Sequence, residues 1–224
     1  LEKWKNKEMS IELIHLRKLL KILYSEPNQR TSLLRADIRE EIARESGESG
    51  GGGDFYAPFW SDAKNHAFSR LDLHTATENR IGGNPRRARL YPFLRDGFLE
   101  WWNNNRRWTN EPFQEVDAPH ARHSFNGMGT IKVENMLAVL DAGDERHFIY
   151  PYFSETPILT DEAARVGLWF IGQALTQQPL MEIRILDVMR GRTYSIDQSP
   201  LQGDEEDILT RRYSAALNDW QHLR

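Results

Sequence analysis

Seven arginines and no lysine lie between residues 80 and 108, and their type and spacing point to charged-ligand chemistry. The same stretch holds only two acidic residues, so its formal charge is +5 in a chain of net charge −4. A guanidinium group can bind phosphate or carboxylate oxygens through two parallel hydrogen bonds, and it stacks on aromatic rings. The residues of this stretch that we expect to contact a partner are Arg80, Arg86, Arg87, Arg89, Arg106, Arg107 and Trp108.

These arginines allow two interpretations. Residues 109–224 have a formal charge of −8, so acidic groups of the same chain or of a partner protein can neutralise them. Alternatively, they bind nucleic acid while neighbouring aromatic rings stack on the bases. Arg86, Arg87 and Arg89 lie near the amino end of a predicted helix, where positive charge opposes the helix dipole. We therefore expect a negatively charged group to meet them.

Aromatic side chains are concentrated in residues 54–60 (DFYAPFW), which hold four aromatic rings. Such a segment needs a large apolar surface, so we expect Tyr56 and Trp60 to contribute to a partner contact. Tyr152 is a further candidate because it follows Pro151, and proline inside a strand indicates a sheet edge or a bulge. Packing of these rings inside the protein is the other interpretation.

A metal-dependent phosphodiesterase or nuclease is the alternative function. In such enzymes carboxylates hold Mg²⁺, and in the restriction-endonuclease type a lysine orients the attacking water. An acidic-x-Lys triplet begins at Asp62, and further acidic residues lie nearby or in predicted strands. The candidate catalytic residues of this alternative are Asp54, Asp62, Lys64, Glu134 and Asp187. Mg²⁺ is expected only under this alternative, and otherwise we expect neither a catalytic residue nor a cofactor.

Histidines suggest a second, weaker metal hypothesis. His120, His123 and His147 could supply three nitrogen ligands, and His66 or His74 could join them. No pattern of residues that would orient these ligands accompanies them. Solvent-exposed loop histidines are the competing interpretation.

Several function classes are excluded by what the sequence lacks. The chain has no cysteine, which rules out disulfides, a thiol nucleophile and cysteine-ligated zinc or iron–sulfur centres. It also has no G-x-S-x-G, P-loop, G-x-G-x-x-G or H-E-x-x-H motif. No apolar run approaches the roughly 20 residues that cross a bilayer. We expect a cytoplasmic protein of bacterial type, and a first residue other than Met suggests a processed or partial chain.

Two helices are predicted in the first part of the chain, over 8–24 and from Thr31 to about 44. They would form a hairpin arm over residues 1–46, through which the chain could form homo-oligomers. Residues 47–53 are rich in glycine and predict a flexible linker. The remaining residues, 54–224, would form the main domain.

That main domain is predicted to begin with a helical part, residues 54–129. One long helix rich in Arg and Trp is expected from Asn84 to about 102, bent or restarted at Pro92. Residues 130–224 alternate between strand and helix patterns in the order ββαββα. The predicted elements are 130–140, 146–153, 161–175, 181–189, 192–196 and 204–223. We therefore expect an α+β fold with a mainly antiparallel four-stranded sheet and its helices on one face.

Taken together, the cationic stretch and the missing catalytic motifs favour a non-catalytic binding subunit. It would use the Arg-rich helix and the aromatic segment to hold a partner protein or nucleic acid. The metal-dependent phosphodiesterase or nuclease stays open as the alternative. No membrane contact is expected.

Overall fold

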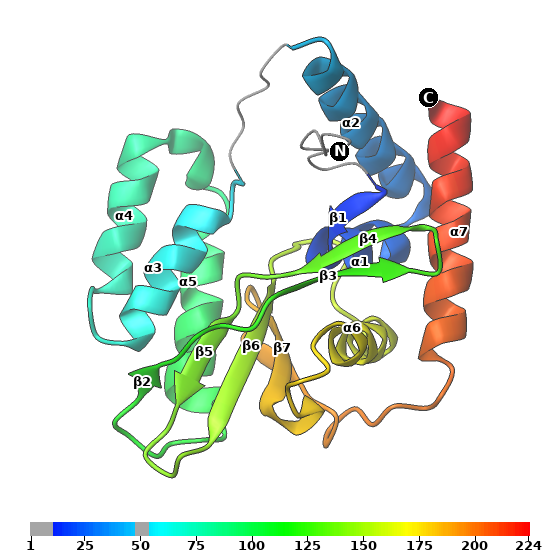
Figure 1. Ribbon diagram of the computed structural model, residues 1–224. Helices are drawn as coiled ribbons and strands as arrows, with labels where there is room; N and C mark the ends of the chain where they lie inside the picture. The colour runs from blue at the N-terminus through cyan, green and yellow to red at the C-terminus, as the bar shows by residue number, and fades with distance from the viewer. Residues whose placement is uncertain (1–10, 48–53) are drawn as a thin grey trace, which may run out of the picture.

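Seven α-helices and two β-sheets build the residues that the computed structural model describes, 11–47 and 54–224 (Figure 1). The predicted α+β class is confirmed. The helices are α1 (Leu16–Tyr24), α2 (Pro27–Glu45), α3 (Ala57–Ala67), α4 (Leu73–Gly83), α5 (Tyr91–Glu100), α6 (Asp161–Ala174) and α7 (Glu205–Leu223). The strands are β1 (Leu13–His15), β2 (Gln114–Glu115), β3 (Ala121–Phe125), β4 (Gly129–Val133), β5 (Leu137–Leu140), β6 (Arg146–Tyr152), β7 (Ile183–Asp187) and β8 (Arg192–Tyr194).

The strands form two separate mixed sheets. The smaller has the order β1-β4-β3, with β1 parallel to β4 and β3 antiparallel to it. The larger has the order β2-β5-β6-β7-β8, in which only the β6–β7 pair is parallel. Helix α6 connects these two parallel strands, as a crossover connection requires.

Strand β6 shows why the larger sheet is buried on both sides. Phe148 and Tyr150 belong to one hydrophobic core, and Ile149 and Phe153 belong to the other. Because successive side chains of a strand point to opposite faces, one strand supplies both cores. Six of its seven residues are buried, which is typical of a strand covered on both faces.

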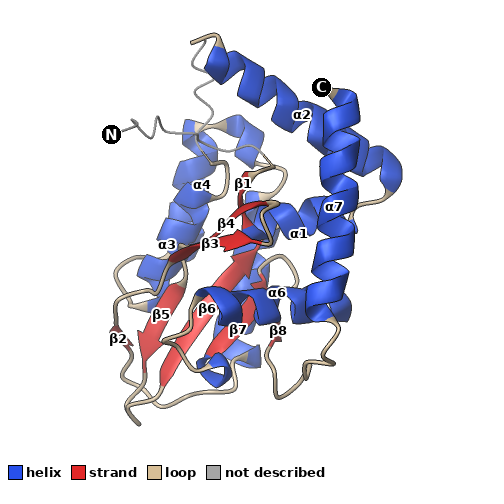
Figure 2. Ribbon diagram, turned by 45° about the vertical axis from the view of Figure 1, so that its right-hand side comes forward, coloured by secondary structure: helices blue, strands red, loops and turns tan. Residues whose placement is uncertain are grey.

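Helices cover both faces of the larger sheet, whereas the sequence predicts helices on one face. Helices α1, α6 and α7 pack on the first core, and α3, α4 and α5 pack on the second, on the left of Figure 1. Figure 2 shows the same division from another side. The prediction was wrong here because it treated residues 54–129 as a separate part of the domain.

The predicted strand 130–140 is two strands that lie in different sheets. Strand β4 joins the smaller sheet and β5 joins the larger one. Between them Asn135 has a positive φ of 69°, a backbone conformation that interrupts a strand. The four predicted strands of the larger sheet are therefore accompanied by a fifth, β2, which the sequence pattern did not indicate.

The long Arg- and Trp-rich helix is divided into three pieces. A 3₁₀ turn over Pro85–Arg87 comes first, α5 begins at Tyr91, and a π-helical turn over Trp101–Asn105 follows. Pro92 lies in the first turn of α5, where its missing N–H costs no hydrogen bond. The sequence left open whether the predicted helix bends or restarts at Pro92. In the structure it restarts there, because Pro92 lies in the first turn of α5.

The helices of the first 46 residues pack into the body of the molecule. Helix α1 buries Leu16, Leu19 and Leu20 in the same core as α6 and α7. Helix α2 begins at Pro27, four residues earlier than predicted, because proline is well accommodated in a first turn. Residues 8–10 of the predicted first helix lie outside the described residues. So does the predicted linker, apart from Gly47.

Candidate functional site

Four of the predicted partner-binding arginines form ion pairs within the chain, one of which joins Nη2 of Arg106 to Oε1 of Glu111 at 3.6 Å. Arg80 makes a two-pronged contact with Asp62, with Nε–Oδ2 at 2.8 Å and Nη2–Oδ1 at 2.9 Å. Arg89 lies 2.8 Å from Glu155. Arg107 pairs with Asp197. Acidic groups of the same chain thus neutralise much of the cationic stretch.

Arg106 is held by aromatic rings. Its guanidinium lies 4.0 Å from the ring centre of Trp102, 4.8 Å from that of Trp108 and 4.4 Å from that of Phe113. The side chain is only 8% exposed, and burial lowers its pKa. Trp108 is buried as well, so neither residue offers a free surface to a partner.

The remaining arginines of the set lie near the surface. Arg87 donates to the carbonyl of Arg80 at 3.3 Å and lies over the ring of Tyr91. Arg86 is exposed and pairs with no carboxylate among the described residues. Within the described residues, one exposed guanidinium without a carboxylate partner can make few contacts with a nucleic-acid backbone.

The predicted aromatic contact residues are largely internal. Trp60 is fully buried, and its Nε1 donates to the carbonyl of Asn135 at 2.7 Å. Tyr152 is 2% exposed and donates to the carbonyl of Pro157 at 2.8 Å. Tyr56 is half-buried and stacks on Phe153, with ring centres 4.9 Å apart.

Arginines hold three of the candidate catalytic carboxylates. Asp54 pairs with Arg17, Asp62 with Arg80, and Asp187 with Arg190. Burial raises the pKa of Asp187, although Arg190 opposes that shift. In the described residues none of these carboxylates belongs to a group of three potential metal ligands.

Glu134 lies in the β4–β5 connection, and Lys64 of α3 contacts the same connection. Lys64 donates to Oδ1 of Asn135 at 2.8 Å, and burial lowers its pKa. Glu134 belongs to a polar cluster with His15, Arg17 and Lys132, of which Lys132 is buried and the other three are half-buried.

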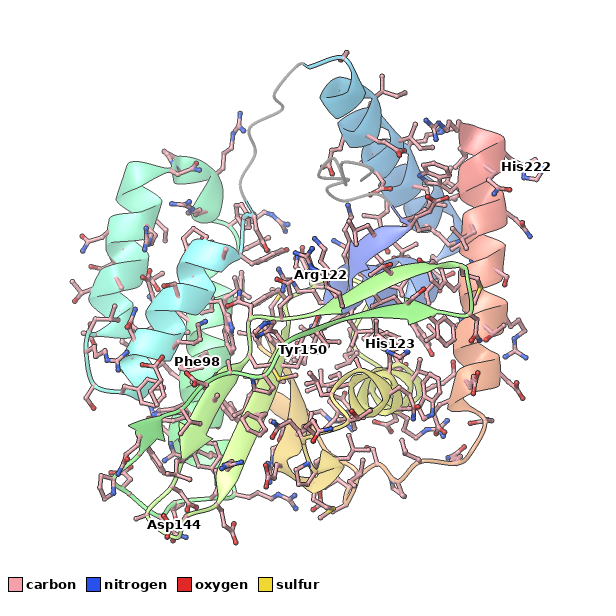
Figure 3. The ribbon with its side chains drawn as sticks, in the orientation of Figure 1. Phe98, Arg122, His123, Asp144, Tyr150 and His222 are labelled. Carbon is pink, nitrogen blue, oxygen red and sulfur yellow. The ribbon has the colours of Figure 1, made fainter. Side chains whose placement is uncertain are left out.

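This cluster joins the two sheets. His15 and Lys132 are neighbours in the β1–β4 register, and Lys132 is 7% exposed. Nδ1 of His15, Nη1 of Arg17 and Oε1 of Glu134 are buried without a hydrogen-bond partner in the described residues. Burial, followed by the charge of Arg17, lowers the pKa of His15 to about 4. The hydroxyl of Tyr150, near the middle of the molecule in Figure 3, accepts from the Arg17 amide at 3.0 Å.

Glu134 is the only member of this cluster among the site residues predicted from the sequence. The available signal was the alternation of polar and apolar residues along β4 into Glu134, which indicates a strand with one polar face. Only the pairing of β1 with β4 brings His15 to that face. The two cations of the cluster are balanced by Glu134 and by Asp54, the ion-pair partner of Arg17.

One group of three potential metal ligands occurs in the described residues: Asp141, Glu145 and His147. Asp141 also accepts hydrogen bonds from the backbone amides of Gly143 and Glu145, so it already stabilises its own turn. His147 Nε2 lies 3.2 Å from Asp141 Oδ2, and burial lowers the pKa of His147. This arrangement is explained by the turn alone.

The predicted histidine ligands are dispersed. His123 lies on β3 against Phe170, with ring centres 5.5 Å apart, and Figure 3 shows it above α6. His147 lies on β6 of the other sheet, and His66 Nδ1 lies 3.2 Å from the carbonyl of Leu71. The described residues contain no cluster of three histidines.

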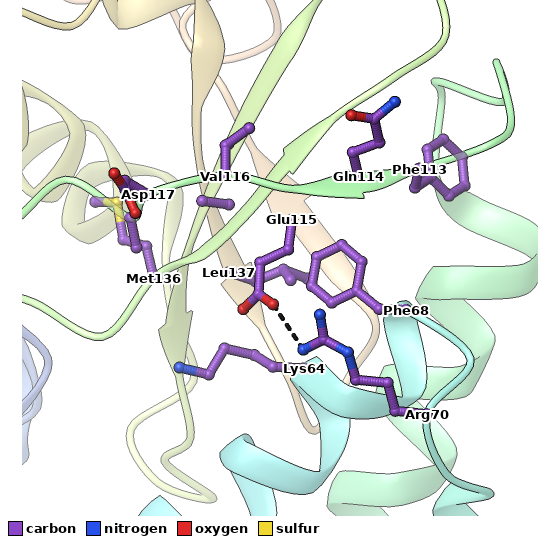
Figure 4. Close-up of a pocket in the computed structure, with 12 residues that line it drawn as sticks. Lys64, Phe68, Arg70, Phe113, Gln114, Glu115, Val116, Asp117, Met136 and Leu137 are labelled. Carbon is purple, nitrogen blue, oxygen red and sulfur yellow. Dashed lines mark ion pairs between the residues drawn. The ribbon is translucent and has the colours of Figure 1, made fainter.

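A groove lies between α3 and β2 (Figure 4). Its volume is about 700 Å³. Lys64, Phe68 and Arg70 form the helical wall. The other wall and the floor consist of Phe113, Gln114, Glu115, Val116, Asp117, Ala118, Met136, Leu137 and Ala138.

An ion pair crosses this groove. Nη1 of Arg70 lies 2.6 Å from Oε2 of Glu115, and the two side chains are 52% and 48% exposed. Figure 4 shows the two side chains pointing toward one another beside Phe68, with the ion pair marked by a dashed line. An exposed pair of this kind contributes about 0–1 kcal/mol, so it can open at little cost.

Comparison with known proteins gives no family. No protein-family model matches the chain, and no curated protein matches it. In the described residues no helix combines the length and apolar character needed to cross a bilayer.

Proposed function

We propose that this chain is a non-catalytic binding subunit that holds an extended segment of a partner protein in the groove between α3 and β2. The observation that carries this proposal is the position of β2, which is an edge strand of the larger sheet and also forms a wall of the groove. Unpaired edge strands bind extended peptides by adding a strand to the sheet.

The direction of the backbone groups supports this mode of binding. The amide of Val116 donates to the carbonyl of Ala138 on β5, at 3.4 Å. Neighbouring residues of an antiparallel strand direct their N–H and C=O groups to opposite sides. The N–H and C=O of Glu115 therefore face the open edge, where a partner strand could pair with them.

The side chains of the groove suit a peptide better than a nucleic acid. Phe68, Phe113 and Leu137 offer apolar contacts for side chains, and both signs of charge are present on the walls. Lys64 and Arg70 face Glu115 and Asp117, so the groove has no excess of positive charge to attract a phosphate backbone.

The test is a pair of substitutions at one residue. Glu115→Pro removes the outward N–H, while Glu115→Ala removes the ion pair with Arg70 and keeps that N–H. Short random peptides would be selected against the wild-type chain by display, and their affinities measured by fluorescence anisotropy. We expect Glu115→Pro to weaken binding about fivefold and Glu115→Ala to retain it, because a backbone hydrogen bond contributes about 1 kcal/mol.

Hydrogen exchange locates the bound peptide. Bound peptide should slow amide exchange in residues 113–116 and leave α7 unchanged, and Arg211→Ala on α7 serves as a distant control. Equal binding to Glu115→Pro and the wild type would overturn the proposal. So would failure to select any peptide that protects residues 113–116.

The metal-dependent phosphodiesterase prediction has no comparable support. Its carboxylates pair with arginines in different places, and the described residues bring no three of them together.

A further inference from the structure

A second hollow lies at the opposite edge of the larger sheet, along β8. Its volume is about 450 Å³. The residues that line it are Asn105, Arg107, Asp161, Arg190, Gly191, Arg192, Thr193, Tyr194, Gln198 and Ser199. Three arginines line it, and each is paired with a carboxylate: Arg107 with Asp197, Arg190 with Asp187 and Arg192 with Asp161.

Arg190 is occupied by the protein itself. Its Nη1 contacts both carboxylate oxygens of Asp187 at 3.1 Å and the carbonyl of Ser154 at 3.1 Å. Its Nη2 donates to the carbonyl of Glu155 at 2.6 Å. Arg190 therefore contributes positive charge to the hollow and fixes its wall.

Arg107 and Arg192 each have N–H donors that form no hydrogen bond within the described residues. Within the described residues, the hydrogen bonds of each guanidinium use Nη2 alone: Arg107 contacts Asp197 and Ser195, and Arg192 contacts Asp161 at 2.9 Å. Their side chains are 48% and 61% exposed. A guanidinium has five N–H donors, so Nε and Nη1 of both residues remain for a ligand.

The surrounding fold positions these two arginines. Arg192 lies over the ring of Tyr194, 4.5 Å from its centre, and Tyr194 donates to the carbonyl of Leu159 at 2.6 Å. Gly191 has a φ of +59°, and a Cβ there would come within 2.7 Å of the carbonyl oxygen of Gly97. The turn between β7 and β8 is thus pressed against α5, which limits its movement.

We infer that this hollow binds the phosphate group of a small molecule, with Arg107 and Arg192 donating to its oxygens. The fork of a guanidinium group matches two oxygens of a phosphate, and both arginines keep N–H donors beyond those that contact their carboxylate partners. Thr193, Gln198, Ser199 and Asn105 line the rest of the hollow and supply neutral hydrogen-bonding groups for the remainder of the ligand. This site is separate from the peptide groove and does not depend on it.

Inorganic phosphate is the probe for a first experiment. Binding would be measured by titration calorimetry at constant ionic strength, with chloride as the reference anion. ¹H–¹⁵N spectra of the arginine Nε–H groups would report which residues are contacted. We expect the Arg107 and Arg192 signals to shift on addition of phosphate, and the Arg95 signal, which lies outside the hollow, to stay in place.

Substitutions of residues that line the hollow should change its affinity for phosphate in opposite directions. Arg107→Gln and Arg192→Gln should each weaken phosphate binding about tenfold or more, as expected for loss of charge-assisted hydrogen bonds. Asp161→Asn should strengthen binding, because it removes the carboxylate that competes for Arg192. A gain of affinity cannot result from misfolding, and Arg95→Gln is the matched control.

Two results would overturn this inference. One is an absence of any heat or signal shift with phosphate, and the other is binding that Arg107→Gln and Arg192→Gln leave unchanged. Succinate and a single-stranded oligonucleotide would be compared in the same assay. Preference for either one over phosphate would assign the hollow to a carboxylate ligand or to nucleic acid and reject the small phosphate ligand.

Discussion

Lys64 of α3 donates a hydrogen bond to Oδ1 of Asn135, at 2.8 Å, and so joins the second layer of helices to the connection between the two sheets. Trp60, one turn earlier on α3, donates to the backbone carbonyl of the same asparagine. Asn135 has a φ of 69°, which most residues avoid. Its side chain and backbone together determine where β4 ends and β5 begins.

Substitution of Asn135 separates these two contributions. Asn135→Gly accepts the positive φ and loses only the hydrogen bond from Lys64, so we expect a loss of about 1 kcal/mol in unfolding free energy. Asn135→Ala adds backbone strain and should cost about 1 kcal/mol more. Urea denaturation of both variants measures the difference. Equal stability of the two variants would contradict a role for the backbone conformation.

Alanine substitutions at three glycines should change the unfolding free energy to different extents. A Cβ at Gly97 would meet the backbone carbonyl of Val188 at 2.2 Å, whereas at Gly167 it would meet the side-chain tip of Ile185 at 2.7 Å. At Gly172 the nearest atoms, of Leu180, lie 3.5 Å away, an ordinary contact. We expect Gly97→Ala to be strongly destabilising and Gly167→Ala to cost about 1–3 kcal/mol. Gly172→Ala, in helix α6, should be neutral or stabilising by up to about 1 kcal/mol.

Thermal melts of the three variants under one set of conditions test this order. A stability of Gly97→Ala equal to that of the wild type would show that α5 can move away from the β7–β8 turn. That result would also weaken the case for a positioned arginine pair in the adjacent hollow.

Stability should fall as the solution is acidified below about pH 6.5, the usual pKa of histidine. Burial lowers the pKa of His15 to about 4 and also lowers that of His147. The unfolded chain therefore binds protons that the folded chain does not, so the unfolding free energy decreases as the pH falls. The slope contributed by one such histidine approaches 1.4 kcal/mol per pH unit between the two pKa values.

Replacement of the titrating group checks the assignment. His15→Gln should flatten the dependence of unfolding free energy on pH between about 4 and 6.5, the window set by the two pKa values. His74→Gln, at an exposed position on α4, is the control and should leave the slope unchanged. An unchanged slope in His15→Gln would show that His15 is protonated as readily in the folded state as in the unfolded chain.

Nucleic acid should bind weakly or not at all. Arg80 and Arg89 pair with carboxylates of the chain, and Arg106 is enclosed by aromatic rings. We expect no measurable binding of single- or double-stranded DNA or RNA at about 50 mM salt, where phosphate contacts are strongest. Electrophoretic mobility shifts at about 50 and 200 mM salt provide the measurement. Tight binding at low salt, reduced by Arg86→Gln, would revive the nucleic-acid interpretation.

Removal of residues 1–46 should prevent cooperative folding. Five residues of α1 are buried in the core, and each such side chain stabilises the fold by about 1.5–3 kcal/mol. The sum is comparable with the total stability of a typical domain, about 5–15 kcal/mol. Circular dichroism and calorimetry of the chain 47–224 test this expectation. A folded truncated chain with a changed mass in solution would support the predicted arm for oligomer formation instead.

Local patterns in the sequence determined much of the secondary structure. The helix from Asp161 to Ala174 was predicted within one residue of its end, because Thr160 caps it and its first turn is acidic. The hairpin of β5 and β6 followed from β-branched and aromatic residues on either side of a short turn. The lack of cysteine likewise excluded disulfides and a thiol nucleophile without reference to structure.

Only the tertiary structure decided which of these elements meet. His15 and Lys132 are 117 residues apart in the chain. They lie next to one another on adjacent strands of the smaller sheet, because β1 pairs in parallel with β4. Charge counting located the arginines but could not show that Arg80 would find Asp62, or that Arg107 and Arg192 would face one hollow. Periodicity and composition are local properties, whereas grooves and ion pairs arise from contacts between distant segments, which no local pattern specifies.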